Sequence, residues 1–164
     1  MKYLLDSDVF IQAKNLHYGL DFCPAFWDWL VASNTSGLVF SIEKAGDEIE
    51  AGADELAGWA AARADGFFLK PYSPILPALS TVSRWAAGQN YEPAAVSTFL
   101  QQADFYLVAH ALAHGFVVVT HEVAAASTKR IKIPNACIGV GVKCMSPFEM
   151  LRRERARFVL GSCS

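Results

Sequence analysis

The sequence predicts an α/β domain of three layers, in which a central, mainly parallel sheet is covered by helices on both faces. Two observations carry this prediction. Short runs with strand character alternate with longer segments of helical periodicity, the order that builds a parallel sheet with crossover helices. One run, Phe116–Thr120, is β-branched and aromatic without alternation, as expected for a strand buried on both faces.

Local signals place the elements of the first half of the chain. The strand Lys2–Leu5 is a short apolar run, and Pro24 suits the first turn of a helix at about Pro24–Ser33. Gly37 marks the turn before the next strand. The remaining elements predicted before the proline-rich loop are a strand at Leu38–Ser41 and helices at Glu43–Ala51 and Asp54–Ala64.

In the second half, Gly115 ends the last of three helices and Ser146 is a candidate N-cap for a basic terminal helix. The three helices are predicted at Leu76–Ala87, Glu92–Leu100 and Gln102–His114. After the buried strand come weaker strand patterns at Lys129–Ile133 and Cys137–Lys143, then the helix at Ser146–Arg157.

Size and composition indicate one globular domain. The chain has 164 residues, 53% hydrophobic and 18% charged, which excludes a disordered protein and a multidomain one. We expect residues 1–164 to form one domain. No apolar run approaches the roughly 18–20 residues that cross a bilayer, and Asp6 and Asp8 interrupt the apolar start before it resembles a signal peptide.

These features favour a cytoplasmic protein without a membrane partner. The four cysteines are too few and too unevenly spaced for a disulfide framework, so we expect reduced thiols. They are Cys23, Cys137, Cys144 and Cys163.

Acidic residues follow two of the predicted strands. Asp6 and Asp8 come directly after the first, and His121 and Glu122 come after the buried one. Ligands of open α/β sheets bind at the carboxyl ends of the strands, so these are candidate site residues. In an extended continuation Asp6 and Asp8 would point to the same side. The alternative for each acid is the capping of a following helix.

A third acid, Asp104, falls within the apolar stripe of its predicted helix, which includes Leu107, Val108 and Ala111. Burying an unpaired carboxylate costs several kcal/mol, and a position in the first helical turn offsets only about 0.3–1 kcal/mol of this cost. We therefore expect a cation to face Asp104.

A fourth acid comes from the cluster Glu43–Glu50, where Glu48 is the best placed to point towards the sheet edge. Four inward carboxylates from separate segments repel one another unless a hard divalent cation lies between them. Mg²⁺ and Mn²⁺ prefer such oxygen ligands, and an ion so held activates water and neutralises charge on a phosphodiester. The pattern predicts metal-dependent phosphodiester hydrolysis.

Charge is distributed unevenly along the chain. Residues 1–128 carry 6 Lys and Arg against 14 Asp and Glu, whereas residues 129–164 carry 8 against 2. A basic segment beside an acidic site would attract a phosphate polymer, and Lys129, Arg130 and Lys132 are the candidates for steering an RNA backbone. Alternatively, the terminal arginines only solvate an exposed helix.

Four pieces of the sequence together resemble the PIN-domain nuclease superfamily. They are LLDSDVFI, the Asp-Glu-Ile after the second strand, Ala-Asp-x-x-Leu-Val-Ala at the start of a helix, and Gly-Phe-Val-Val-Val-Thr-x-acid. The resemblance implies a PIN-like three-layer fold. It also implies catalytic and metal-binding roles for Asp6, Glu48, Asp104 and Glu122, with Asp8 and Thr120 as auxiliary residues. His121 is a further auxiliary candidate because it adjoins a proposed ligand and would contact the scissile phosphate; the alternative is a solvent-facing position.

More narrowly, the chain resembles a bacterial group of PIN-like proteins of unassigned function that is related to VapC-type toxins. This implies a Mg²⁺- or Mn²⁺-dependent endoribonuclease that leaves a 5′-phosphate and a 3′-hydroxyl. It also implies a cognate antitoxin and a homodimer as partners. Glu122 departs from the pattern, because the last metal position commonly carries Asp with a further acid after it. A catalytically weakened PIN-like protein that binds RNA or a partner is therefore an alternative.

Three other patterns in the sequence have more than one interpretation. Asp6-x-Asp8 after a strand also resembles the opening of haloacid-dehalogenase-type phosphatases, whose first Asp is a nucleophile, but Phe10 and the missing downstream motifs depart from that family. His110 and His114 have a spacing that could bind zinc, but both are predicted at the surface. The aromatic cluster Phe22, Phe26, Trp27 and Trp29 is predicted to be core or interface rather than a base-stacking surface.

Overall fold

The sheet is parallel throughout and lies at the centre of the molecule. The computed structural model describes residues 1–161, so Cys163 lies outside the described residues. In this range five strands form one sheet in the order β3-β2-β1-β4-β5. They are β1 (Tyr3–Leu5), β2 (Val39–Ile42), β3 (Phe68–Leu69), β4 (Val117–Val119) and β5 (Cys144–Met145).

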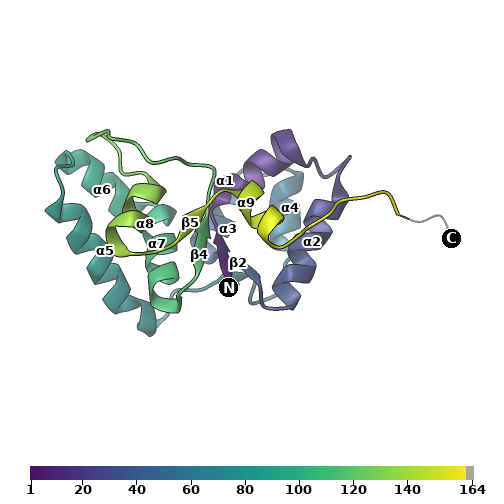
Figure 1. Ribbon diagram of the computed structural model, residues 1–164, viewed down its shortest axis with the longest axis horizontal. Helices are drawn as coiled ribbons and strands as arrows, with labels where there is room; N and C mark the ends of the chain where they lie inside the picture. The colour runs from purple at the N-terminus through teal and green to yellow at the C-terminus, as the bar shows by residue number, and fades with distance from the viewer. Residues whose placement is uncertain (162–164) are drawn as a thin grey trace.

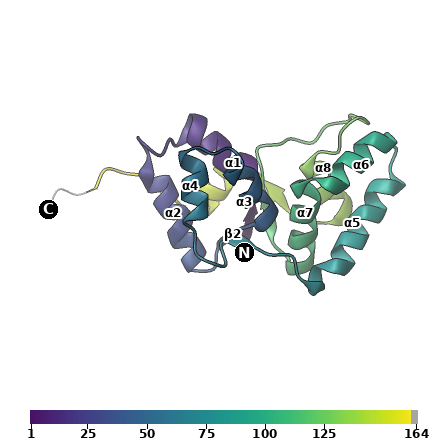
Figure 2. The same cartoon turned by 180° about the vertical axis from the view of Figure 1, so that it is seen from behind.

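Helices cover both faces of this sheet, which confirms the predicted three-layer architecture (Figure 1). One layer holds α5 (Leu76–Gly88), α6 (Pro93–Gln101), α7 (Ala103–His114) and α8 (Ile133–Val140). The other holds α1 (Ser7–Gln12), α2 (Pro24–Thr35), α4 (Glu55–Ala61) and α9 (Pro147–Arg153). Figure 2 shows α3 (Glu43–Glu50) between the two layers. Two short helical turns complete the fold, the π-helical turn η1 (Ala13–His17) and the 3₁₀ turn η2 (Ser73–Ile75).

Alternate residues of the buried strands supply two separate cores. In β1, Tyr3 and Leu5 pack against the layer of α2, whereas Leu4 packs against the layer of α7. Val118 in β4 likewise faces the α7 layer, and its two strand neighbours face the other. Because side chains alternate across a strand, a run that is apolar at every position fits only a sheet covered on both faces.

The predicted boundaries need three corrections. The strands predicted at Lys129–Ile133 and Cys137–Lys143 are wrong. The first segment is irregular up to the start of α8 at Ile133, and most of the second segment belongs to α8. Pro134 lies in the first turn of that helix and Gly141, at a φ of 79°, ends it, so the apolar run is a helix with both its usual end signals. The terminal helix begins at its predicted cap, with the Ser146 hydroxyl accepting from the Glu149 N–H, but it ends at Arg153 rather than Arg157.

Cys23, Cys137 and Cys144 are free thiols. Among residues 1–161 no helix combines the length and apolar character that crossing a bilayer requires. Among the aromatic residues around α2, Phe26 and Trp27 lie in the core as predicted, whereas Phe22 is exposed.

His110 corrects a prediction, because it is buried in α7 and only 1% exposed. Neither ring nitrogen has a hydrogen-bond partner. Burial, helped by the neighbouring His114, lowers the pKa of His110 to about 4. The sequence predicted His110 at the surface because a helical wheel shows only one apolar stripe on this helix. In the structure α7 packs against neighbours on more than one side, so its buried surface is wider than that stripe.

This buried ring predicts a loss of stability in mild acid. The unfolded chain protonates the histidine near pH 6.5, but the folded state keeps it neutral down to about 4, so unfolding is favoured progressively as pH falls through that window. Urea unfolding should show that the wild type loses on the order of 1–2 kcal/mol more between pH 7 and pH 5 than His110→Leu does. Equal pH dependence of the two proteins would contradict this assignment.

Candidate active site

Chain segments far apart in sequence meet at the carboxyl edge of the sheet. Strand β1 ends at Leu5 in register with Val119 of β4, so the next residues, Asp6 and Thr120, lie side by side. Helix α3 starts at this edge because it follows β2. Helix α7 starts here as well because it runs back towards the beginning of β4, which places Asp104 in its first turn.

Asp6 is the most buried acid of the group, at 6% exposed. It occupies the N-cap position of α1, and its side chain makes no cap hydrogen bond. Instead its Oδ2 accepts from the Thr120 hydroxyl at 3.0 Å. The capping alternative is therefore wrong for Asp6, since the carboxylate faces into the site.

Asp8 belongs to the same network although the chain is helical there rather than extended. The Thr120 hydroxyl lies 3.2 Å from Asp8 Oδ2, so its single proton is shared between the two aspartates. The His121 N–H donates to Asp8 at 3.3 Å, and the Glu122 N–H donates to the Thr120 oxygen at 3.1 Å. Asp8 is thus as central as Asp6 rather than peripheral.

Glu48 reaches this network through Ser7, which is not among the site residues predicted from the sequence. The Ser7 hydroxyl donates to Glu48 Oε2 at 2.7 Å, linking α1 to α3, and Glu48 itself is exposed. A serine between two acids at the end of a strand is the signal that could have identified Ser7, because a helix starting there places it at the site edge.

Burial and neighbouring charges both raise the pKa values of two acids at this site. Burial raises the pKa of Asp104 to about 7, with further increases from Glu122, Glu48 and Asp8 and a decrease from Arg130. Burial likewise holds the pKa of Asp6 well above its usual range, reinforced by the charges of Asp8 and Asp104. The Thr120 hydrogen bond opposes this rise.

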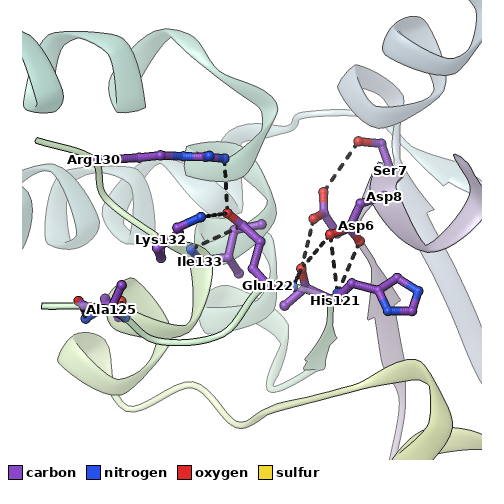
Figure 3. A network of polar contacts seen from close by, with 11 residues as sticks. Asp6, Ser7, Asp8, His121, Glu122, Ala125, Arg130, Lys132 and Ile133 are labelled. Carbon is purple, nitrogen blue, oxygen red and sulfur yellow. Dashed lines mark hydrogen bonds and ion pairs between the residues drawn. The ribbon is translucent and has the colours of Figure 1, made fainter. Parts of the chain in front are cut away.

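Glu122 points away from the other carboxylates, towards basic residues (Figure 3). Its Oε1 lies 3.2 Å from Arg130 Nη2 and 3.9 Å from Lys132 Nζ, and its Oε2 accepts from the Ile133 N–H at 3.4 Å. Burial still raises the pKa of Glu122, with Arg130 opposing. The cation expected opposite Asp104 is therefore in part Arg130, and two predicted RNA-steering residues pair with Glu122.

The acids of this site are of the right chemical type to bind a hard divalent cation, but their side chains are only partly arranged to do so. Within residues 1–161 no three His, Cys, Asp or Glu side chains converge closely enough to form a ready ligand set. Burial and the neighbouring acids nevertheless raise the pKa values of Asp6 and Asp104, although Arg130 opposes the rise at Asp104. The ligand atoms that Asp6, Asp8 and Asp104 offer are carboxylate oxygens, which Mg²⁺ and Mn²⁺ prefer. Glu122 would join them only after leaving its basic partners.

Comparisons with known proteins agree with this fold. The sequence model described as "Domain of unknown function (DUF4411)" matches residues 3–158. No curated protein matches the sequence. The structure is similar to that of FitAcB from Neisseria gonorrhoeae, with a TM-score of 0.55, 18% identity, and coverage of 89% of this chain and 98% of the other. It is also similar to FitAB bound to an IR36 DNA fragment, with a TM-score of 0.56, 17% identity, and coverage of 89% and 95%. These likenesses concern the fold, and they confirm its PIN-like three-layer form.

Proposed function

Because this chain belongs to the DUF4411 family and has a PIN-like fold, we propose that it is a Mg²⁺- or Mn²⁺-dependent ribonuclease that hydrolyses RNA phosphodiester bonds. One observation carries the proposal. At the carboxyl edge of the sheet, burial and the charges of acids from α1, α3, α7 and the segment after β4 together raise the pKa values of Asp6 and Asp104. A fold has no structural need for such repulsion, whereas a site for a divalent cation requires it.

The side chains take separate roles under this proposal. Asp6 and Asp104 would hold the cation, with Asp8 and Glu48 completing the site directly or through water. In such sites Mg²⁺ or Mn²⁺ supplies an activated water nucleophile and neutralises charge on the phosphodiester. Thr120 favours the ionised form of Asp6 by donating a hydrogen bond to its carboxylate, which opposes the rise in the pKa of Asp6.

A basic wall beside the acids would position the RNA backbone. Arg130 and the exposed Lys129 line a cavity of about 230 Å³ together with Thr98 and Gln102. Because phosphate contacts position a nucleic acid without reading its sequence, Lys129, Arg130 and Lys132 are proposed to hold the strand rather than to select it.

We further propose that the protein is the toxin of a toxin–antitoxin pair, with a cognate antitoxin and a second copy of the chain as partners. The similarity of this fold to the structures of FitAcB and of DNA-bound FitAB supports this proposal. Expression of the wild type in a bacterial host should arrest growth, and Asp6→Ala should relieve the arrest. Equal growth with both proteins at equal abundance would argue against a toxin.

The geometry of Glu122 favours one alternative, a PIN-like protein that binds RNA or a partner with weakened catalysis. Its ion pairs with Arg130 and Lys132 hold its carboxylate away from Asp6. If these pairs persist when the cation binds, the site has one carboxylate fewer than the proposed quartet.

A cleavage assay with defined RNA tests the function. We expect cleavage with Mg²⁺ or Mn²⁺, none with EDTA, and a loss of at least about 100-fold in Asp6→Asn. Asp47→Asn is the matched control, because Asp47 is an exposed acid on α3. Metal-dependent stabilisation without cleavage would favour the weakened protein. Release of phosphate from small phosphomonoesters, lost in Asp6→Asn, would favour the haloacid-dehalogenase-type phosphatase.

A further inference from the structure

Three aromatic rings from distant segments meet beside the acidic network. They are His17 at the end of η1, His121 after β4, and Phe148 in the first turn of α9. The ring centroids of His17 lie 5.5 Å from His121 and 5.1 Å from Phe148, and His121 lies 5.6 Å from Phe148. We call these three rings the aromatic cluster at the site mouth.

This cluster adjoins the carboxylates directly. The backbone N–H of His121 donates to Asp8, so the ring of the same residue is fixed next to the acidic site, and Figure 3 shows it pointing away from Glu122. The π-helical turn η1 brings His17 to the same place, and such wide turns occur frequently at functional sites.

The cluster is only partly covered. His17 is exposed, and His121 and Phe148 are half-buried. Phe148 and His17 meet at 86°, an edge-to-face contact in which one of the two rings leaves both of its faces uncovered by the other. Tyr18, the neighbour of His17 in the sequence, instead stacks on buried Phe26, with ring centroids 4.5 Å apart, and packs against the core.

Positive charge accompanies these rings on α9. Arg152 lies one helical turn after Phe148, so both side chains project from the same face of the helix, and Arg152 is exposed. An aromatic surface with an adjacent arginine can bind both parts of a nucleotide, because the base stacks on the rings and the phosphate pairs with the positive charge.

We propose that the aromatic cluster at the site mouth, His17, His121 and Phe148, is a stacking subsite for one nucleobase of a single-stranded RNA, next to the carboxylates proposed to hold the catalytic cation. The proposal rests on the proposed ribonuclease function and adds the substrate class, an unpaired strand. A base in a duplex cannot enter the subsite, because its faces are covered by its neighbours.

The test measures binding and cleavage separately. Single-stranded RNA labelled with a fluorophore is titrated with wild type, His17→Ala and Phe148→Leu in EDTA, and KM and kcat are measured with Mg²⁺. Stacking on one aromatic ring predicts that each substitution weakens binding and raises KM about tenfold with kcat little changed. Phe22→Ala is the matched control, because Phe22 is an aromatic at 68% exposure outside the cluster.

A set of RNAs with one abasic nucleotide at successive positions identifies the stacked base. One position should lose affinity about tenfold with the wild type and lose little more with His17→Ala, because both changes remove the same contact. His17 is exposed, so this arm remains informative if Phe148→Leu fails to fold.

Two results would overturn the proposal in distinguishable ways. If the wild type cleaves RNA but tolerates every abasic position, and both substitutions leave KM unchanged, the subsite is wrong and the ribonuclease function stands. If the wild type neither binds nor cleaves single-stranded RNA at any metal concentration, the function fails and the subsite with it.

Discussion

Replacing Asp104 with Asn is expected to abolish RNA cleavage while making the metal-free protein more stable. Asp104 is held among other acids with its pKa raised to about 7, chiefly by burial and then by Glu122 and Glu48. An amide of nearly the same shape keeps the packing and removes the charge. Activity should fall by at least about 100-fold, since the substitution takes away a proposed ligand of the catalytic cation.

The direction of the stability change follows from proton linkage. Between an unfolded pKa near 3.9 and the folded value of about 7, the native state holds a proton that the unfolded chain has released, so stability falls as pH rises through this window. At pH 8 the wild type therefore carries the full penalty. Asp104→Asn should unfold at a temperature about 4–8 °C higher in EDTA, corresponding to roughly 2 kcal/mol.

Added metal should reverse this order. Mn²⁺ or Mg²⁺ at about 100 times its dissociation constant should stabilise the wild type by about 2.7 kcal/mol and Asp104→Asn by much less. Asp47→Asn should behave as the wild type in both measurements, because its carboxylate is exposed. A wild type whose unfolding temperature is the same with EDTA and with saturating Mn²⁺ would refute the metal site.

Thr120→Val is expected to have the second large effect, through the ionisation of Asp6. Its hydroxyl is buried, lies within hydrogen-bond distance of Asp6 and Asp8, and accepts from the Glu122 N–H. Removing it leaves buried polar groups unpaired, which should cost about 1–3 kcal/mol of stability.

The accompanying change in pH dependence identifies the cause. The Thr120 hydrogen bond lowers the pKa of Asp6, so its loss raises that pKa and moves the acidic limb of the pH–rate profile to higher pH. Thr120→Val should lose activity by roughly tenfold or more at pH 7 and recover part of it at pH 9. Thr120→Ser keeps the hydroxyl and serves as the control. An unshifted profile in Thr120→Val would mean that Asp6 needs no help to ionise.

The architecture could be predicted from the sequence because the local patterns and the need to cover both faces of a buried sheet lead to the same fold. A strand such as Phe116–Thr120, apolar at every position, must be covered on both faces, and the helices between the strands supply the cover. The errors arose where local signals compete. Cys137–Lys143 reads as a strand by residue type, but Pro134 and Gly141 bound a helix.

The candidate acids were also identifiable from sequence, because carboxylates after strands and within an apolar helical stripe have few structural explanations. Their partners were not identifiable. The hydroxyl of Thr120 between Asp6 and Asp8, the link from Ser7 to Glu48, and the buried His110 all depend on how helices pack, which periodicity along one element does not reveal.

By itself, the sequence determined the three-layer parallel fold and indicated which acids are candidates for a site at its edge, since both follow from the order of residue types along the chain. Tertiary structure alone decided which side chains meet. Glu122 pairs with Arg130 and Lys132, and the rings of His17, His121 and Phe148 come together from three segments. The physical reason is that Coulomb and stacking interactions depend on distance in space, and 131 positions separate His17 from Phe148 along the chain.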